Sequence, residues 1–191
     1  ADTVTTSRVS GVILNTFNEP IPGITVELNG DTAVTATDGT FTVETASVDP
    51  EAALKVHGEE FTGNQKYPFV AEKLKLLFNF GVHNNVNNTL PRPIYLPALD
   101  VANEHTIDPA QDVTVTTTTI PGASVFVRSG TLNNQQGQLF TGQMSITEVP
   151  RDLTPAALPS DLNPDLVVTI QPGEMQFTQQ APLNLPNRAG Y

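Results

Sequence analysis

Short runs of alternating apolar and polar residues, separated by turn sequences, constrain this chain more than any other feature. Four such runs lie between Arg8 and Glu44, divided by Asn18–Gly23, Asn29–Asp31 and Asp38-Gly39. Alternation of period two marks a strand with one buried face, and Asn-Gly and Asp-Gly tolerate the positive φ of tight hairpins. Short strands packed this densely along the chain predict an antiparallel β-sandwich. Val9, Gly11 and Ile13 share one face of their strand, and we expect Ile24, Val26 and Leu28 on the inner face of the next.

The remaining sequence also favours short strands and loops. Alternation over 70–80 favours a strand over a short helix, and the Asn-rich stretch 81–93 is predicted to be a loop. Prolines make Pro93–Asp100 a connector or an edge strand, because proline cannot donate to a β-ladder. Further strands are predicted at 54–57, 112–119, 124–127, 143–149 and 166–171.

Charge and composition exclude some partners. The 191 residues carry 9 Lys and Arg against 20 Asp and Glu, a formal net charge of −11. Nucleic-acid binding needs basic side chains that release counterions, so we expect no nucleic-acid partner. No run approaches the roughly 18 apolar residues of a membrane helix, so no membrane insertion is expected. The chain has no Cys, which excludes disulfides and thiolate chemistry.

The first forty-five residues carry a pattern of turn and strand residues: Val9-x-Gly11, then Pro22-Gly23-Ile24-x-Val26-x-Leu28-x-Gly30, then Thr37-Asp38-Gly39-x-Phe41. This pattern resembles the carboxypeptidase regulatory-like family, with its transthyretin-like and CNA-B-like relatives. The resemblance implies a β-sandwich accessory domain without catalytic residues, common in bacterial secreted and surface proteins.

The second half is similar to the ZU5-like β domain that follows such modules in large bacterial extracellular proteins. The residues that carry this similarity are Ile120-Pro121-Gly122-Ala123, Phe140-x-Gly142-x-Met144-Ser145-Ile146, Leu158-Pro159, Ile170-x-Pro172-Gly173-x-Met175-x-Phe177 and Pro182-Leu183-x-Leu185-Pro186-Asn187. In those proteins the domain continues with further strands, whereas this chain ends at Tyr191. The resemblance therefore implies an incomplete second sandwich with an exposed edge.

We accordingly predict an all-β chain of two antiparallel β-sandwich-like modules joined by a Pro-rich connector. The expected boundaries are 1–90 for the first module, 91–100 for the connector and 101–191 for the second. The chain starts at Ala1 without an initiator Met. That start fits a mature secreted chain after signal cleavage, and equally an excised fragment.

The sequence offers no catalytic or cofactor-binding residues that we would name. His57, His83 and His105 lack the spacing of metal ligands, and Ser124 lies in a strand-like run without a Gly-x-Ser-x-Gly elbow. No glycine-rich phosphate loop occurs. We therefore expect no enzyme, no cofactor and no metal-ligand set.

Two groups of aspartates leave a Ca²⁺ site open as an alternative. Asp31 and Asp38 flank one hairpin, and Asp100, Asp108 and Asp112 cluster near the connector. Ca²⁺ takes six to eight oxygen ligands, but no Asp-x-Asp-x-Asp-Gly loop is present. Solvated acidic turns are the simpler interpretation, and Asp38 reads as the first residue of an Asp-Gly turn.

The family resemblances suggest further chemistry that this sequence supports weakly. Gln138–Thr141 stands where some ZU5-type domains cleave themselves, but the His is missing. An isopeptide bond would need Lys55 or Lys75 beside an Asn, and no spacing indicates a pair. Sugar binding would need exposed aromatic rings, and the chain has no Trp and only Tyr67, Tyr95 and Tyr191. Asn87-Asn88-Thr89 is a glycosylation sequon.

The expected function is a non-catalytic extracellular or cell-surface structural protein that self-assembles into filaments by β-strand addition. The polar, β-branched segment Ala1–Arg8 is the candidate donor, and the edge near Val167 or Leu185 is the candidate acceptor. The alternative is a ligand-binding or spacer module of an adhesin or large secreted protein. Its ligand site would lie on the loops Gly58–Pro68 or Gly81–Leu90.

Overall fold

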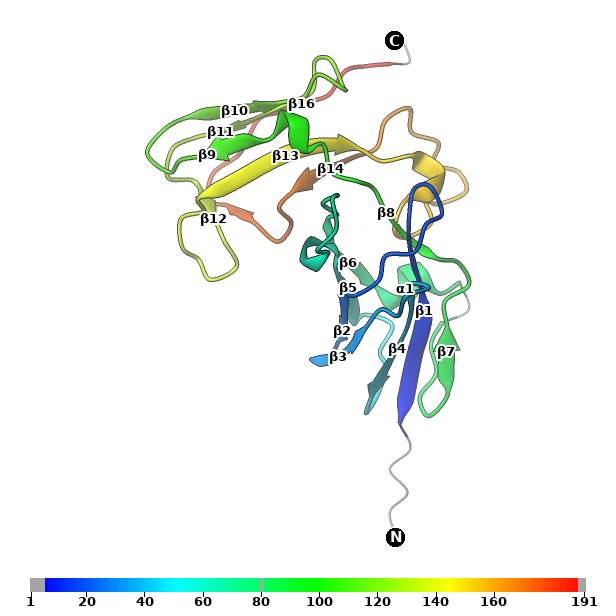
Figure 1. Ribbon diagram of the computed structural model, residues 1–191. Helices are drawn as coiled ribbons and strands as arrows, with labels where there is room; N and C mark the ends of the chain where they lie inside the picture. The colour runs from blue at the N-terminus through cyan, green and yellow to red at the C-terminus, as the bar shows by residue number, and fades with distance from the viewer. Residues whose placement is uncertain (1–5, 80, 189–191) are drawn as a thin grey trace. The chain divides into compact units, whose positions relative to one another are not determined.

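The computed structural model describes residues 6–79 and 81–188, and these residues are almost entirely strands and loops (Figure 1). This content of strands confirms the predicted all-β class. The chain divides into two compact units. The first unit comprises the chain up to Ala98 together with Pro150–Asn163. The second comprises Leu99–Val149 and the chain from Pro164 onward.

One sheet of the first unit is built around a single long strand. In this sheet β1 lies between β4, which is antiparallel to it, and β7, which is parallel (Figure 1). A fourth strand, β8, pairs in parallel with the last residues of β1. The bounds are β1 Ser7–Asn15, β4 Thr40–Thr45, β7 Asn87–Thr89 and β8 Ile94–Leu96.

The second sheet of this unit is antiparallel throughout, in the order β3-β2-β5-β6. Its β2–β3 hairpin turns at Asn29 and Gly30, both at positive φ as the Asn-Gly signal predicts. The elements are β2 Thr25–Leu28, β3 Asp31–Val34, β5 Ala53–His57, the 3-10 turn η1 Gly58–Glu60, β6 Phe69–Lys73 and α1 Leu74–Leu77.

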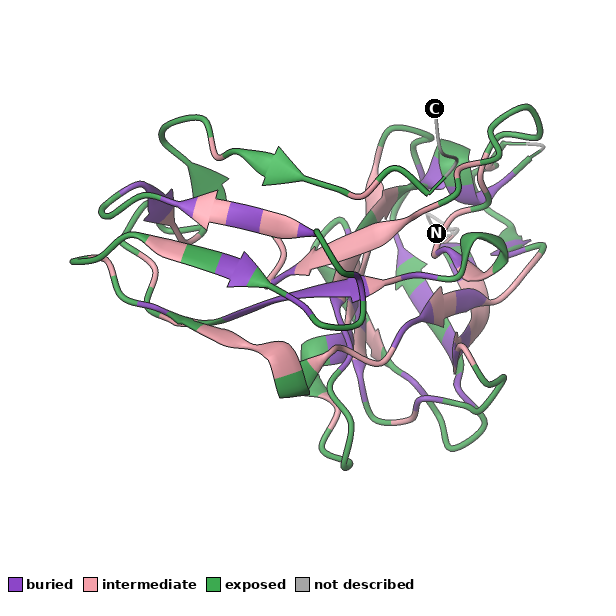
Figure 2. Cartoon of the chain, turned by 90° about the horizontal axis from the view of Figure 1, so that it is seen from above, coloured by how far each residue is buried: buried purple, intermediate pink, exposed green. Residues whose placement is uncertain are grey.

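The core of the first unit lies between these two sheets. Strands alternate buried and accessible residues along their length, as the colours of Figure 2 show. The predicted inner-face residues Ile24, Val26 and Leu28 are fully buried, which confirms the period-two analysis, and Val9 and Ile13, on one face of β1, are fully buried as well. Packing is close at the Asp38-Gly39 turn, where a Cβ on Gly39 would overlap the Ile13 carbonyl oxygen.

The second unit consists of smaller sheets, ordered β10-β11-β16, β12-β15 and β14-β13-β9, each antiparallel. Its core is formed mainly by β-branched and leucine side chains around Val115, Val125 and Ile146. The elements are η2 Val101–Asn103, β9 His105–Ile107, β10 Val113–Thr116, β11 Ser124–Val127, β12 Leu132–Asn133, β13 Gly142–Glu148, η3 Arg151–Leu153, β14 Val168–Gln171, β15 Gln176–Phe177 and β16 Leu183–Asn184; of these, η3 belongs to the first unit.

Two local predictions were wrong. The strand expected over 70–80 ends at Lys73 and passes into α1, which buries Leu74 and Leu77 three residues apart and exposes Leu76. The expected loop 81–93 contains β7. Asn88 stabilises β7 because its side-chain amide donates to the carbonyls of Arg8 (3.1 Å) and His83 (2.9 Å). Its side-chain oxygen accepts the His83 N–H (2.8 Å).

The unit boundaries also differ from those predicted. Residues 91–98 are not a free connector, because β8 pairs with β1 and buries Ile94 and Leu96 in the first core. Pro150–Asn163, expected in the second module, belongs to the first unit. The two parallel neighbours of β1 are likewise an addition to the expected antiparallel pattern.

Candidate functional site

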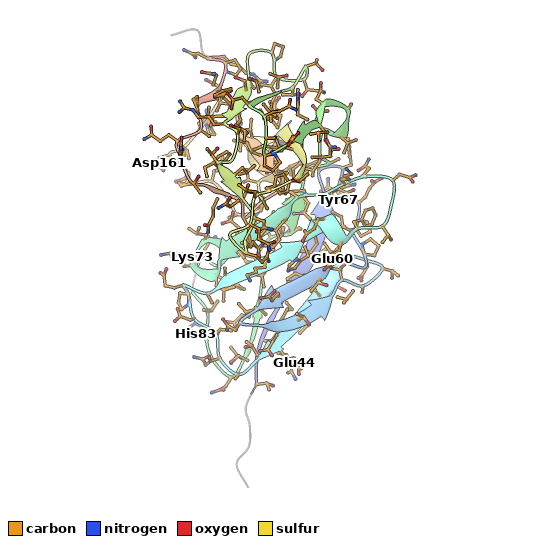
Figure 3. All side chains as sticks on the ribbon, turned by 90° about the vertical axis from the view of Figure 1, so that its left-hand side faces the viewer. Glu44, Glu60, Tyr67, Lys73, His83 and Asp161 are labelled. Atoms are coloured by element: carbon orange, nitrogen blue, oxygen red, sulfur yellow. The ribbon has the colours of Figure 1, made fainter. Side chains whose placement is uncertain are left out.

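The three histidines occupy separate structural positions. His57 lies between Glu59 (Nδ1 to Oε1, 2.9 Å) and Glu27 (Nε2 to Oε2, 3.6 Å). His105 bonds through Nε2 to the backbone of Thr116 at 3.2 Å. Figure 3 places His83 well away from Tyr67 in the first unit. In residues 6–79 and 81–188, no group of three or more His, Asp or Glu side chains could hold a metal ion.

Three of the aspartates considered for Ca²⁺ accept hydrogen bonds from separate segments of the chain. Asp38 accepts the Thr40 hydroxyl (2.6 Å) and backbone N–H (3.1 Å), and these bonds lower the pKa of its carboxyl. Asp108 accepts the Ala110 N–H at 2.9 Å, and Asp112 accepts the Ser129 N–H at 2.8 Å. Asp38 and Asp108 therefore each organise their own turn, as the turn interpretation expects, whereas Asp112 binds a residue seventeen positions away.

Asp100 is the centre of a larger polar network in the second unit. Its carboxylate accepts the hydroxyls of Thr117 (2.6 Å) and Thr119 (3.1 Å) and the amide of Asn103 (2.9 Å). Burial alone would raise the pKa of Asp100, but these hydrogen bonds outweigh it and the pKa is lowered. The backbone N–H of Asp100 donates to Thr147 (2.8 Å), so the network joins the start of this unit to β13.

The lysines considered for an isopeptide bond contact carboxylates. Lys55 lies 3.1 Å from Glu27. Lys75 and Lys73 both bind Glu51, at 2.6 and 2.8 Å. Hydrogen bonds from these two ammonium groups lower the pKa of Glu51 to about 2. The structure does not bring Lys55 or Lys75 to an Asn side chain, so that chemistry has no geometric support.

The aromatic residues do not form a flat binding surface. Tyr67 is buried, with its hydroxyl 3.0 Å from Gln65, and Tyr95 is half-buried beneath Arg92. Tyr191 lies outside the described residues. Ser124 lies in β11, as predicted, and 138–141 follows a tight turn after β12. The sequon residue Asn87 is exposed on β7.

Each predicted acceptor position adjoins an edge strand of the second unit. Val167 comes directly before β14, and Leu185 follows β16. Within the described part of this unit, β14 pairs only with β13, and β16 pairs only with β11. Leu183 and Leu185 are 49% and 44% exposed. The residues Leu183–Leu185, named the C-terminal edge below, therefore present apolar side chains beside an unpaired strand side.

The other candidate is a groove in the first unit that sequence reasoning missed. It has a volume of about 540 Å³, and we name it the Arg92 groove. Its floor is the segment that returns to the first unit after β13. It is lined by Arg92, Arg151, Asp152, Thr154, Ala157, Leu158, Pro159, Ser160, Leu162 and Asn163. Arg92 and Arg151 are 59 positions apart in the sequence, and they meet because Pro150–Asn163 belongs to the first unit. No local motif marks either residue.

Comparisons with known proteins add little to this geometry. No protein-family model matches the sequence, and no curated protein matches it. Among solved structures, the chain is similar to the Bacillus anthracis TIE protein, with 12% identity and a TM-score of 0.32 over 74% of this chain and 24% of that one. A DUF3823 family protein from Parabacteroides merdae is similar over 88% of this chain and 82% of its own length, with 12% identity and a TM-score of 0.29.

The chain spans about a quarter of the TIE protein. Likenesses at these TM-scores do not decide between functions. Among the described residues, no helix has the length and apolar character needed to cross a membrane.

Proposed function

We propose that this protein is a non-catalytic, extracellular structural protein that assembles through strand addition at the C-terminal edge. The observation that carries the proposal is that, among the described residues, β16 has a partner strand on one side only and exposes Leu183 and Leu185. An added strand supplies main-chain hydrogen bonds, and the alternate side chains supply specificity. Edge strands are often protected by Lys or Pro; β16 has no Lys, but Pro182 and Pro186 flank it, so an added strand would pair with Leu183–Leu185.

The proposed donor is the start of the chain, shortened by one finding. Ser7 and Arg8 already pair with Thr45 and Glu44 of β4, so they are not available to another subunit. The donor is therefore residues 1–6, which are polar and β-branched; residues 1–5 lie outside the described residues. A donor at one end and an acceptor at the other form a heterologous contact, which gives a filament when the rotation does not close.

The family resemblances support the same proposal. We infer that the first unit is a carboxypeptidase regulatory-like domain and the second a ZU5-like domain. Such domains act as accessory modules of bacterial extracellular proteins, which accounts for the proposed location and the absence of a proposed reaction. The all-β architecture of both units agrees with this inference.

Negative-stain electron microscopy with light scattering tests the proposal. The unaltered chain is expected to form filaments. Leu183→Lys, which places a charge at the C-terminal edge, and deletion of residues 1–6 are each expected to leave folded monomers. Val101→Lys is the matched control, because Val101 is 47% exposed in the same unit but lies in η2 rather than at a strand edge.

A monodisperse particle of about 20 kDa for the unaltered chain, in agreement with its mass of 20.4 kDa, overturns the proposal. Filaments that persist in the Leu183→Lys variant overturn the choice of edge. Circular dichroism of each variant separates lost assembly from lost folding.

A second candidate function is a ligand-binding module, and the Arg92 groove favours it. The groove lies apart from the two loops that the sequence suggested. Its volume is within the range of about 300–1,000 Å³ typical of small-molecule sites.

A further inference from the structure

Arg92 stands at the junction of three hollows in the first unit. Besides the Arg92 groove, it lines an apolar pocket of about 130 Å³ with Leu76, Leu77 and Ala156. It also lines a hollow of about 340 Å³ over β1 and β4.

The hydrogen bonds of Arg92 use only part of its capacity. Its Nη2 donates to the backbone carbonyls of Thr154 (2.9 Å) and Asp152 (3.4 Å), and its guanidinium carbon lies 5.5 Å from the centre of the Tyr95 ring. Its Nη1 is buried and has no hydrogen-bond partner in the described residues. A buried N–H of a charged group without a partner costs free energy, so such a group needs an explanation, for example a bound water, an ion or a ligand.

Neither arginine that lines the groove has a carboxylate partner among the described residues. Arg8, Lys55, Lys73, Lys75 and Arg188 each contact a Glu carboxylate within 3.1 Å. Arg92 holds only carbonyl oxygens, and Arg151 donates to the Asn163 side-chain oxygen at 2.6 Å. In an acidic chain with net charge −11, two arginines that line one groove and hold neutral oxygens leave positive charge for an anion.

We propose that the Arg92 groove binds a small monocarboxylate with an apolar body. A guanidinium matches a planar carboxylate with two parallel N–H···O bonds, and the exposed Arg151 can offer such a pair, whereas Arg92, with its Nη1 buried, supplies positive charge at the groove. Leu158, Pro159 and Leu162 supply apolar wall for the rest of the ligand. Asp152 lines the same groove and repels multiply charged anions, which favours a single carboxylate over a phosphate.

This inference rests on the second candidate function and is independent of assembly. The probe is 3-phenylpropionate, titrated into the chain by isothermal calorimetry and followed by NMR chemical shifts. Its amide, 3-phenylpropionamide, and inorganic phosphate are the matched ligands. Saturable binding of the carboxylate is expected, with shifts confined to 92 and 151–163. The amide is expected to bind about tenfold more weakly or worse.

Arg92→Gln and Arg151→Gln are each expected to weaken binding about tenfold. Arg128→Gln, an exposed arginine of the second unit, is the control and leaves binding unchanged. Arg151→Gln keeps the test valid if loss of Arg92 disturbs folding, because Arg151 is exposed.

No saturable binding, equal binding of the amide, or binding unaffected by Arg151→Gln overturns the proposal. Equal binding of phosphate overturns the assignment to a monocarboxylate. The Leu183→Lys variant is expected to retain binding, so failure of assembly and failure of this site are distinguishable.

Discussion

The two units share one fold class but differ in how fully they enclose a core. The first packs a sheet around β1 against the antiparallel sheet around β2 and β5, and eighteen described side chains form its buried cluster. The second divides its strands among three sheets of two or three strands, and nine described side chains form its buried cluster. Since burial of apolar area is the dominant favourable term in folding, the second unit has less stability to lose.

The difference also separates the two proposed roles. In the first unit, the Asn88 side chain donates to a backbone carbonyl beside β1, and the Arg92 groove is lined by charged groups. Exposed apolar side chains at a strand edge occur in both units, at Val34 in β3 and at Leu183 in β16. The proposed ligand site lies in the unit with the larger buried cluster, and the proposed association site lies in the other.

The largest expected effect comes from matched truncations in the two cores. Ile13→Ala and Ile146→Ala each remove a fully buried side chain, at a cost of about 2–5 kcal/mol. We expect Ile146→Ala to abolish amide protection in β9–β14, whereas Ile13→Ala leaves β1 and β4 protected. Hydrogen exchange with mass spectrometry measures both. Leu139→Ala, at a 53% exposed position, is the control. If instead Ile13→Ala abolished amide protection in β1 and β4 while Ile146→Ala left β9–β14 protected, the second unit would be the more stable of the two.

A smaller effect is expected from the polar anchors of each unit. Asn88→Ala removes a buried side chain that donates to the carbonyls of Arg8 and His83, and should cost about 1–3 kcal/mol in urea denaturation. Asp100→Ala should cost less, because the Thr117 and Thr119 hydroxyls can rotate to other acceptors. A larger loss for Asp100→Ala would identify its network as the principal support of the second unit.

The smallest effect is the acid dependence of surface ion pairs. The folded pKa of Glu51 is about 2 against an ordinary value of 4.5. Its contribution is therefore complete above about pH 4.5 and is lost as the pH falls toward 2. In the Glu51→Gln variant, the melting temperature of the first unit should depend less on pH between about 4.5 and 2. Glu148→Gln should act less on the second unit, because one Arg188 rather than two lysines lowers the Glu148 pKa. If the melting temperature fell equally steeply with pH in the variants and in the unaltered chain, these ion pairs would not contribute to the acid dependence.

Local pattern predicted much of the fold, and its failures have physical causes. Alternation and turn signals predicted β1 to β4 and the inner face of β2, because Val26 and Leu28 lie in the core of the first unit; β3 has no buried residue. The same alternation failed at Leu74 and Leu76, where backbone hydrogen bonds to Ala52 and Pro50 turn the chain into α1. β7 escaped detection because a buried Asn, rather than an apolar residue, fixes it.

The two candidate sites also differ in whether the sequence could predict them. The edge positions Val167 and Leu185 follow from where strand-like residues stop, so sequence could place them. The Arg92 groove depends on Thr154 and Asp152 meeting Arg92 across the fold, and nothing near Arg92 in sequence predicts that contact.

Because Pro150–Asn163 belongs to the first unit, that unit is built from two separate segments of the chain, which bears on its folding during synthesis and on its cleavage by proteases. During synthesis the first unit lacks a structural piece until most of the second has left the ribosome, although domains otherwise tend to fold from the amino terminus onward. A fragment ending at Ala98 would leave Arg92 without the Thr154 carbonyl. Neither unit can be released intact by a single cut, and a protease nick between Ala98 and Pro150 would break the covalent link between the two segments of the first unit.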